Sequence, residues 1–218
     1  MPDTRQWRCK LAKQRLKIND AIVSDEGERL ILVDERDKPV GYASKAECHD
    51  GEGQLHRAFS LFVVDSKGQV LMQQRSSQKR LWPMYWSNSC CSHPREGETM
   101  DTATQRRLEE ELGISCNFKY LFKFRYQEEY GDEGSEHEFC WVYLGRSDDP
   151  VRCNRNEIAS WCFIMPATLD RMLIEHPQWF TPWFRMEWRR IMSHHREEFD
   201  ALTDDAGSRA DEPARLAG

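Results

Sequence analysis

The chain has 218 residues, of which 39% are hydrophobic, and this is enough to form one domain of ordinary size with a continuous core. Its formal net charge of −6 argues against a general attraction to nucleic acid or anionic lipid, because both partners attract basic surfaces. The sequence contains neither an apolar run long enough to cross a bilayer nor a hydrophobic secretory segment at its start, so we expect a cytoplasmic protein without a membrane partner. Its eight cysteines are too sparse for a disulfide scaffold, and we expect free thiols.

Composition divides the chain into three parts. Residues 1–20 are rich in Lys and Arg and are predicted to form a basic N-terminal extension. Residues 21–199 contain no repeat, low-complexity linker or break in composition, which indicates a single domain. Residues 200–218 mix Ala, Asp, Gly and Pro with almost nothing to bury, which predicts a disordered tail.

Hydrophobic alternation and turn residues predict strands, the first four of which form two antiparallel hairpins. The predicted strands lie at 30–34, 40–43, 58–65, 69–75, 120–127 and 136–144. Helices are predicted at 99–112, at 166–176, and from the Thr181-Pro182 pair to about Phe199. We therefore expect an α/β fold of the α+β kind, a mixed sheet flanked by helices.

The helix predicted at 99–112 carries Arg107 and Glu111 beside its apolar face, and an Arg and a Glu four residues apart are commonly an ordinary surface pair. The segment that begins at Ser92 nevertheless resembles the Nudix box. The residues in register with the box are Glu98, Arg106, Leu108, Glu110, Glu111, Gly113 and Ile114. Ser92 stands where the box has its opening Gly, and Arg107 stands where the box has a metal-binding Glu. A cation at that position predicts that pyrophosphate hydrolysis is lost and that Arg107 contacts phosphate.

A second cluster, Cys90, Cys91 and His93, lies just upstream. A structural zinc site would need cysteines spaced by two to four residues and a second ligand pair, which the sequence does not offer. A pair of buried, inert cysteines is the simpler alternative.

A third cluster contains Glu136 and Glu138, which the period of a strand places on one face. Two neighbouring carboxylates repel each other unless they are solvated at an edge or share a cation. His49 and His56 bracket a glycine-bearing loop, and each alone is commonly a surface residue. Together with His93, these residues form a mixed nitrogen and oxygen ligand set suited to Mg²⁺, Mn²⁺ or Zn²⁺.

From about residue 30 to about residue 186, the sequence resembles type I isopentenyl-diphosphate delta-isomerases, a Nudix-fold family. The strings that carry this resemblance are LHRAFS, QQR followed by Lys79, SNSCCSHP, QRRLEEELG, SEHEFCWV and TPWFRM. The family fold would add an N-terminal hairpin and C-terminal helices to the Nudix-like sheet.

The resemblance also implies a site. It implies catalytic roles for Cys91 and Glu138, with Tyr126 completing the catalytic group. It implies a metal ion held by His49, His56, His93, Glu136 and Glu138, and a second ion, Mg²⁺, near Glu111 that bridges to the substrate diphosphate. It implies substrate contacts from Lys45, Arg75, Lys79, Arg107 and Trp183.

The implied reaction, conversion of isopentenyl diphosphate to dimethylallyl diphosphate, needs an acid and a base, because one proton is added to the alkene and another is removed next to a tertiary carbocation. We expect Glu138 to be the acid and Cys91 the base. Trp183, with Trp82 and Trp86, could face the cation in a dry pocket, whereas Trp82 and Trp86 could equally be core residues.

Two alternatives remain: a Nudix hydrolase of a nucleoside or prenyl diphosphate, and a non-catalytic metal-binding module on the same scaffold. We expect a monomer or a weak homodimer.

Overall fold

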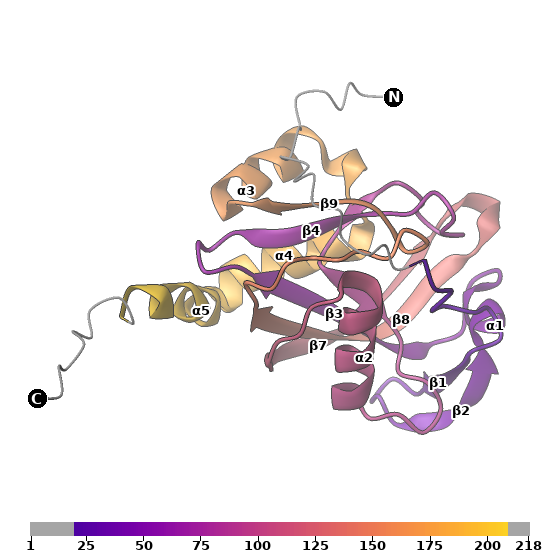
Figure 1. Cartoon of the computed structure of the whole chain (residues 1–218). Coiled ribbons are helices and arrows are strands. Elements are labelled where there is room, and N and C mark those ends of the chain that lie inside the picture. Colours follow the sequence, from indigo (N-terminus) through magenta and orange to yellow (C-terminus); the bar gives the residue numbers. More distant parts are fainter. Residues whose placement is uncertain (1–19, 209–218) are drawn as a thin grey trace, which may run out of the picture.

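The structure is a computed structural model that describes residues 20–208, so almost all of the predicted basic extension at 1–20 and the end of the predicted tail lie outside the described residues. One mixed sheet forms its centre (Figure 1). The strands are β1 Arg29–Val33, β2 Pro39–Ser44, β3 His56–Val64, β4 Val70–Arg75, β5 Trp86–Ser87, β6 Cys90–Ser92, β7 Phe118–Glu129, β8 Ser135–Arg146 and β9 Ile158–Ile164. The helices are α1 Lys45–His49, α2 Met100–Leu112, α3 Pro166–Glu175, α4 Pro182–His194 and α5 Arg196–Ser208, with short 3-10 turns at Gly131–Glu133 and Pro177–Trp179.

Strand β3 is the centre of the sheet. It pairs in parallel with β8 from His56↔Glu138 to Val64↔Arg146, while its other edge meets β1, β6 and β4 in turn, each antiparallel. Nearly every residue of β3 is buried, as expected for a strand covered on both faces.

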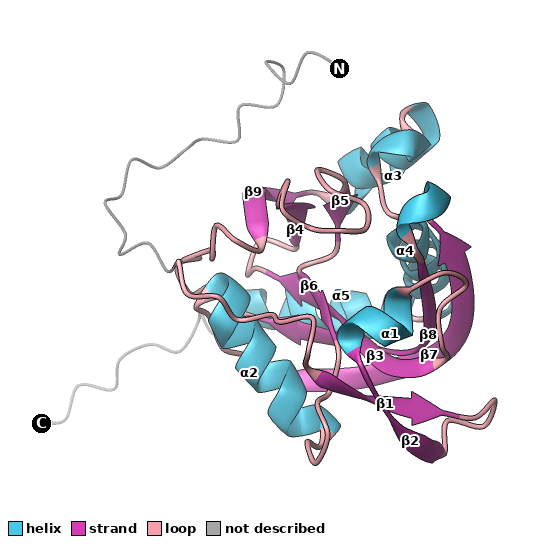
Figure 2. Ribbon diagram, turned by 90° about the vertical axis from the view of Figure 1, so that its right-hand side faces the viewer, coloured by secondary structure: helices cyan, strands magenta, loops and turns pink. Residues whose placement is uncertain are grey.

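Helices cover both faces of this sheet (Figure 2). On one face, Leu108 and Leu112 of α2 pack with Phe59 and Leu61 of β3. On the other face, Phe184 and Trp188 of α4 stack on Phe62 of β3, and residues of α3 and α5 belong to the same core. The mixed sheet flanked by helices confirms the expected α+β class, and the part of the chain that was described contains no helix both long and apolar enough to span a membrane.

Local sequence explains the helix ends. Ser44 and Glu47 form a reciprocal capping box at the start of α1. Thr99 caps α2, and Gly113 ends it in the left-handed conformation with φ of 61°. Pro182 occupies the first turn of α4, where its missing N–H removes no hydrogen bond.

Three expectations differ from the structure. The second hairpin pairs only at Val64↔Val70, because β4 turns away to pair with β9. The last helix is two helices, since the chain leaves helical geometry at His195 and α5 begins at Arg196. The tail was predicted to be disordered from residue 200, but α5 continues to Ser208 because Phe199 and Leu202 pack against the core.

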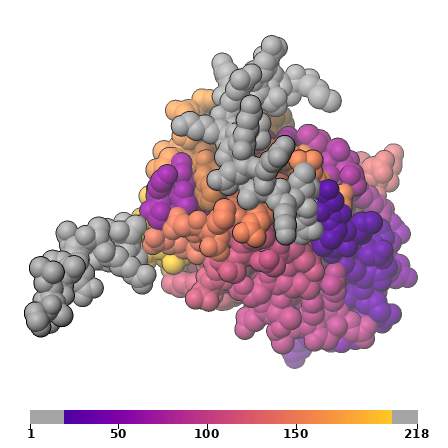
Figure 3. Space-filling view, viewed as in Figure 1, coloured from indigo at the N-terminus to yellow at the C-terminus, as the bar shows by residue number. Residues whose placement is uncertain are grey.

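The seven cysteines within the described residues are free, as expected. The first residues after position 20, indigo in Figure 3, lie against the main body of the protein. The backbone oxygen of Ala21 accepts a hydrogen bond from Asn154, and that of Val23 accepts one from Arg107.

Asp37, in the turn between β1 and β2, ties this hairpin to the rest of the sheet. Its carboxylate accepts hydrogen bonds from Arg57 of β3, Lys123 of β7 and Trp141 of β8, all at 2.8 Å. The hairpin leads directly into α1, so the Asp37 contacts also position the residues that α1 carries.

We expect Asp37→Ala to lower the free energy of unfolding by about 3 kcal/mol, because it leaves Arg57 without its buried partner. Asp37→Asn, which tolerates the left-handed backbone (φ 62°) and can still accept a hydrogen bond, should lose less. Urea denaturation of both variants measures the difference, and equal stability of Asp37→Ala and the unmodified chain would contradict this role.

Candidate active site

A cavity of about 430 Å³ opens beside the start of β3. Its lining residues come from the segment before β1, from α1, from β4 and the segment after it, from β6, α2, β7 and β8, from the segment before β9, and from the start of α4. Among its lining residues are His49, His93, Glu136, Glu138, Cys91, Tyr126, Trp183, Lys45, Arg75, Lys79 and Arg107. The sequence had predicted all of these as site residues, and the fold brings them to one place.

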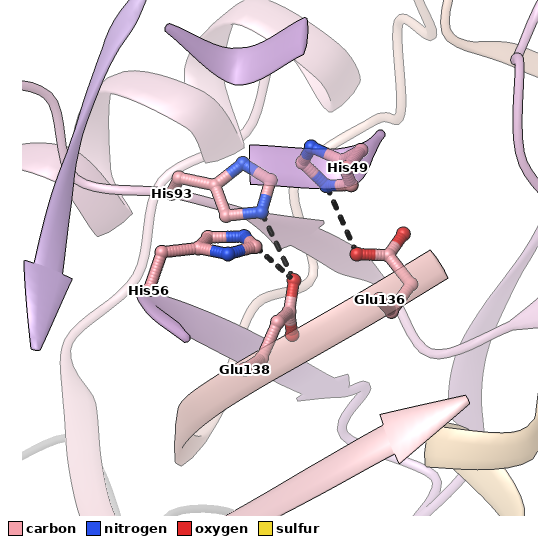
Figure 4. Close-up of side chains that lie close together, drawn as sticks. All are labelled: His49, His56, His93, Glu136 and Glu138. Atoms are coloured by element: carbon pink, nitrogen blue, oxygen red, sulfur yellow. Dashed lines mark hydrogen bonds and ion pairs between the residues drawn. The ribbon is translucent and has the colours of Figure 1, made fainter. Parts of the chain in front are cut away.

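The three histidines and two carboxylates form one cluster (Figure 4). Five ligand atoms from His49, His56, His93, Glu136 and Glu138 lie within 4.8 Å of one another. The ring centroids of the three imidazoles are 4.8 to 5.2 Å apart.

Strand register explains the cluster. His56 lies directly opposite Glu138 in the parallel β3–β8 pair, and Glu136 lies two residues earlier on the same face of β8. His93 follows β6, which pairs with the other edge of β3. The turn before β8 packs tightly on α1, since a Cβ at Gly134 would overlap the backbone oxygen of His49. This close contact brings His49 to Glu136.

The geometry of the imidazoles fits a metal ion. The Nδ1 atoms of His49 and His56 lie 2.7 Å from the backbone oxygens of Lys45 and Gln54, an arrangement that fixes Nδ1 as the donor and leaves Nε2 as the ligand atom. The Nε2 atom of His56 is buried and has no hydrogen bond. A buried polar atom without a partner is unfavourable unless a cation or another group satisfies it, so the residues fit a divalent metal ion.

Electrostatics in the cluster are dominated by burial. Burial lowers the pKa of His56 to about 3 and that of His93 well below its usual range. Neutral imidazole is the form that ligates metals. Burial alone would lower the pKa of His49 and raise that of Glu136. The 3.0 Å ion pair between these two residues outweighs burial, so the pKa of His49 is raised and that of Glu136 is lowered to about 2.

Glu138 connects the metal cluster to the apolar part of the cavity. Its Oε1 atom lies 2.9 Å from Nε2 of His93, and its Oε2 atom accepts a 2.7 Å hydrogen bond from the Tyr126 hydroxyl. Burial and the neighbouring Glu136 charge raise the pKa of Glu138 well above its usual range. Without a bound cation, both influences favour the protonated form of this carboxyl.

Cys91 is, with Glu138, the other candidate reactive group of the cavity. Its thiol donates to Oδ1 of Asn88 at 2.7 Å, and its sulfur accepts the Trp183 indole N–H at 3.2 Å. Burial, with a contribution from the Glu187 charge, raises the pKa of Cys91 to about 12. The Trp183 ring therefore contacts Cys91, and its centroid lies 6.2 Å from that of the Tyr126 ring.

The basic residues gather at another part of the wall. Lys79 and Arg107 both pair with Glu157, and Arg107 also pairs with Glu111 at 2.5 Å. Arg75 donates to the backbone oxygens of Leu81 and Trp82 and lies over the Trp183 ring. These three cations, with Lys45, form a basic region suited to a diphosphate.

Other Nudix-box residues have structural contacts. Arg106 makes two hydrogen bonds to Glu98, at 2.7 and 2.8 Å, and so ties α2 to the loop before it. Glu111 is buried beside Arg107 and is not a member of the five-residue cluster. The expected second ion at Glu111 therefore has no ligand cluster of its own among the described residues.

Trp82 and Trp86 do not line the cavity. Trp82 is buried against the edge of Trp183, with ring centroids 5.2 Å apart, and Trp86 packs on the same core. The structure thus favours the core interpretation of both residues.

Sequence analysis missed three residues of this region: Asn88, Glu157 and Glu187. Asn88 lies within the SNSCCSHP string, so its position beside Cys91 was a usable signal. Glu157 and Glu187 stand in no recognised motif, and only the folded contacts reveal them.

Comparison with known proteins identifies the family of this chain. Residues 54–185 match the model of the NUDIX domain family. The chain is 45% identical to isopentenyl-diphosphate Delta-isomerase 1 of Photorhabdus laumondii, an alignment that covers 80% of this chain and 99% of that protein. It is 43% identical to isopentenyl-diphosphate Delta-isomerase of Burkholderia multivorans, covering 72% of this chain and 89% of that protein.

Solved structures agree on the fold. A crystal structure from Deinococcus radiodurans superposes with a TM-score of 0.62 at 26% identity, covering 75% of this chain and 98% of that one. A MutT NUDIX hydrolase from Burkholderia pseudomallei superposes with a TM-score of 0.51 at 19% identity, covering 63% of this chain and 98% of that one, and shows the fold alone. The chain therefore belongs to the NUDIX domain family and, within it, to the isopentenyl-diphosphate Delta-isomerases.

Proposed function

We propose that this protein converts isopentenyl diphosphate to dimethylallyl diphosphate and so provides prenyl units for isoprenoid synthesis. The proposal rests on one observation. A single cavity is lined by the Cys91 thiol, by the Glu138 carboxyl of the His/Glu cluster and by the basic region. The relatives bear the name of this activity. We expect a monomer or weak homodimer in the cytoplasm, without nucleic acid or membrane partners.

The basic region positions the substrate. In this proposal, Lys45, Arg75, Lys79 and Arg107 hold the diphosphate, while the hydrocarbon end lies beside Trp183. Anchoring the diphosphate fixes the alkene between the two reactive groups, which removes most of the entropic barrier to proton transfer.

The reaction moves two protons. Glu138, in its protonated form, gives a proton to the terminal alkene carbon, and a tertiary carbocation forms. Cys91 acts here as a thiolate, after its thiol has released a proton to solvent and before the substrate fills the cavity. The thiolate takes a proton from the neighbouring carbon, and the double bond forms there. After turnover Cys91 releases this proton and Glu138 regains one, so no net proton is consumed. The indole N–H of Trp183 and the hydroxyls of Ser60 and Ser87 are the donors that stabilise the thiolate.

The metal sites supply charge. A divalent ion, Mg²⁺, Mn²⁺ or Zn²⁺, held by the five-residue cluster would fix Glu138 in place. A second ion, Mg²⁺, near Glu111 would add positive charge for the diphosphate and would share this carboxylate with Arg107.

The rival activity, pyrophosphate hydrolysis, is disfavoured by Arg107. Its guanidinium occupies the box position of a metal-binding Glu and is neutralised by Glu111 and Glu157. Incubation with isopentenyl diphosphate and Mg²⁺ should give dimethylallyl diphosphate in the proton NMR spectrum without released phosphate. Phosphate without the isomer would support a hydrolase instead.

Replacing either reactive group should abolish isomerisation. We expect Cys91→Ala and Glu138→Gln each to reduce kcat by about 10³-fold, the usual contribution of a general acid or base. Proton NMR measures the rate, and circular dichroism checks that the fold is kept. Full rates in both folded variants would refute the assignment and favour a non-catalytic module.

Removal of the metal should stop turnover. Dialysis against a chelator is expected to inactivate the protein, and Mn²⁺ or Mg²⁺ should restore the rate. Elemental analysis should find a bound divalent ion in the unmodified chain and much less in His56→Gln, because this substitution removes the buried Nε2 ligand. Equal metal content in both proteins would place the ion elsewhere.

The basic region should affect substrate binding more than chemistry. We expect Lys45→Met to raise KM about tenfold with little change in kcat, because a diphosphate contact is made equally in the ground and transition states. Lys67→Met, at the exposed β3–β4 turn, is the matched control and should change neither constant. A fall in kcat alone would argue against a binding role for Lys45.

A further inference from the structure

Glu187 is a fully buried carboxyl that the proposed reaction does not use. It lies on α4, one helical turn after Trp183, and its exposed fraction is 0%. None of the ion pairs in the described part of the chain involves it, and its Oε2 atom has no hydrogen-bond partner. Burying a carboxyl without a cation is costly, so its position calls for a reason beyond packing.

Glu187 reaches Cys91 through a serine. Ser60 of β3 hydrogen-bonds to the Glu187 carboxyl, and the Ser60 hydroxyl lies 3.7 Å from the Cys91 sulfur. Cys140 of β8 lies within 3.5 Å of both Ser60 and Glu187. Strands β6 and β8 pair with the two edges of β3. Cys91 of β6, Ser60 of β3 and Cys140 of β8 therefore lie on the same face of the sheet, which α4 covers.

No cation among residues 20–208 balances this carboxyl. The titratable groups around it are Cys140 in contact, with Cys91 and Glu138 close enough to be influenced by its charge. Burial raises the pKa of Glu187 to about 8. At neutral pH the carboxyl is therefore protonated and can donate one hydrogen bond.

We propose that Glu187 is a positioning residue for Cys91, whose protonated carboxyl donates to Ser60 and leaves the Ser60 hydroxyl free to donate to the Cys91 sulfur. Ionised Glu187 would instead accept the hydrogen of Ser60, which would turn that donor away from the thiolate. The inference rests on the proposed role of Cys91 as the base. The proposal identifies Glu187 as a residue whose ionisation at alkaline pH lowers kcat.

The pH dependence of kcat tests the proposal. In the unmodified chain kcat should fall as pH rises through about 8, the pKa of Glu187. Glu187→Gln, whose amide donates at every pH, should lose this alkaline decline. Glu187→Leu should reduce kcat about tenfold across the range with KM unchanged, because it removes the donor altogether.

Ser60→Ala provides the matched control. It removes the connection, so adding Glu187→Gln to it should have no further effect on the alkaline side. An alkaline limb that is the same in Glu187→Gln and the unmodified chain would overturn the proposal.

Two measurements do not depend on isomerase activity: the rate at which Cys91 is alkylated and the pH dependence of the unfolding free energy. Alkylation of Cys91 by iodoacetamide, followed by mass spectrometry of its peptide, should be faster in Glu187→Gln than in the unmodified chain at pH 9 and equal at pH 6.5. Equal rates at both pH values would contradict the inference even if the isomerase activity is confirmed, whereas the expected difference without isomerisation would refute only the proposed function.

The pH dependence of the unfolding free energy tests whether the pKa of Glu187 is raised in the folded chain. The folded pKa of about 8 lies above the ordinary value of 4.5, so the unfolded chain loses this proton first as pH rises. The unfolding free energy of the unmodified chain should therefore fall, relative to Glu187→Gln, between about pH 4.5 and 8 and level off above. A constant difference would show that Glu187 ionises normally.

Discussion

The parallel pairing of β3 with β8 is the constraint on which the site depends. It sets His56 opposite Glu138 and places Glu136 on the same face, so two carboxylates meet three imidazoles in a buried cluster. A shift of the pairing by one residue would turn both carboxylates to the other face of the sheet, against α2. The candidate metal-binding cluster, the Tyr126 hydrogen bond and the position of the cavity follow from this register.

The same sheet separates two kinds of environment within one cavity. Ion pairs around Arg107 and Glu157 keep one part charged, whereas Trp183 and the core beneath α4 keep the other part apolar. Cys91 lies in the apolar part, where only a few oriented donors reach its sulfur. In the proposed reaction, a carbocation formed there would be shielded from water, and the diphosphate would be held by the charged part of the cavity.

Much of this arrangement could be predicted from sequence because it is local or carried by distinctive strings. The helix predicted at 99–112 and the alternation of Glu136 and Glu138 along a strand are local signals, and both are confirmed. The ligand set could be named from the resemblance, and the structure brings its members together.

The rest depends on long-range contacts. β4 leaves its hairpin for β9, about ninety residues later in the chain, and nothing between residues 64 and 75 signals this. Helix α5 forms where composition predicted disorder, since Phe199 and Leu202 meet a core built by distant strands. Glu187 resembles any surface glutamate in sequence, and only the packing of α4 on Ser60 and Cys140 reveals it.

A crystal structure of the metal-loaded protein with isopentenyl diphosphate bound would test the central claim most directly. The account predicts the diphosphate against Lys45, Arg75, Lys79 and Arg107, with the alkene between the Cys91 sulfur and the Glu138 carboxyl. An alkene that points toward solvent, or a thiol and carboxyl that lie on the same side of it, would contradict the account.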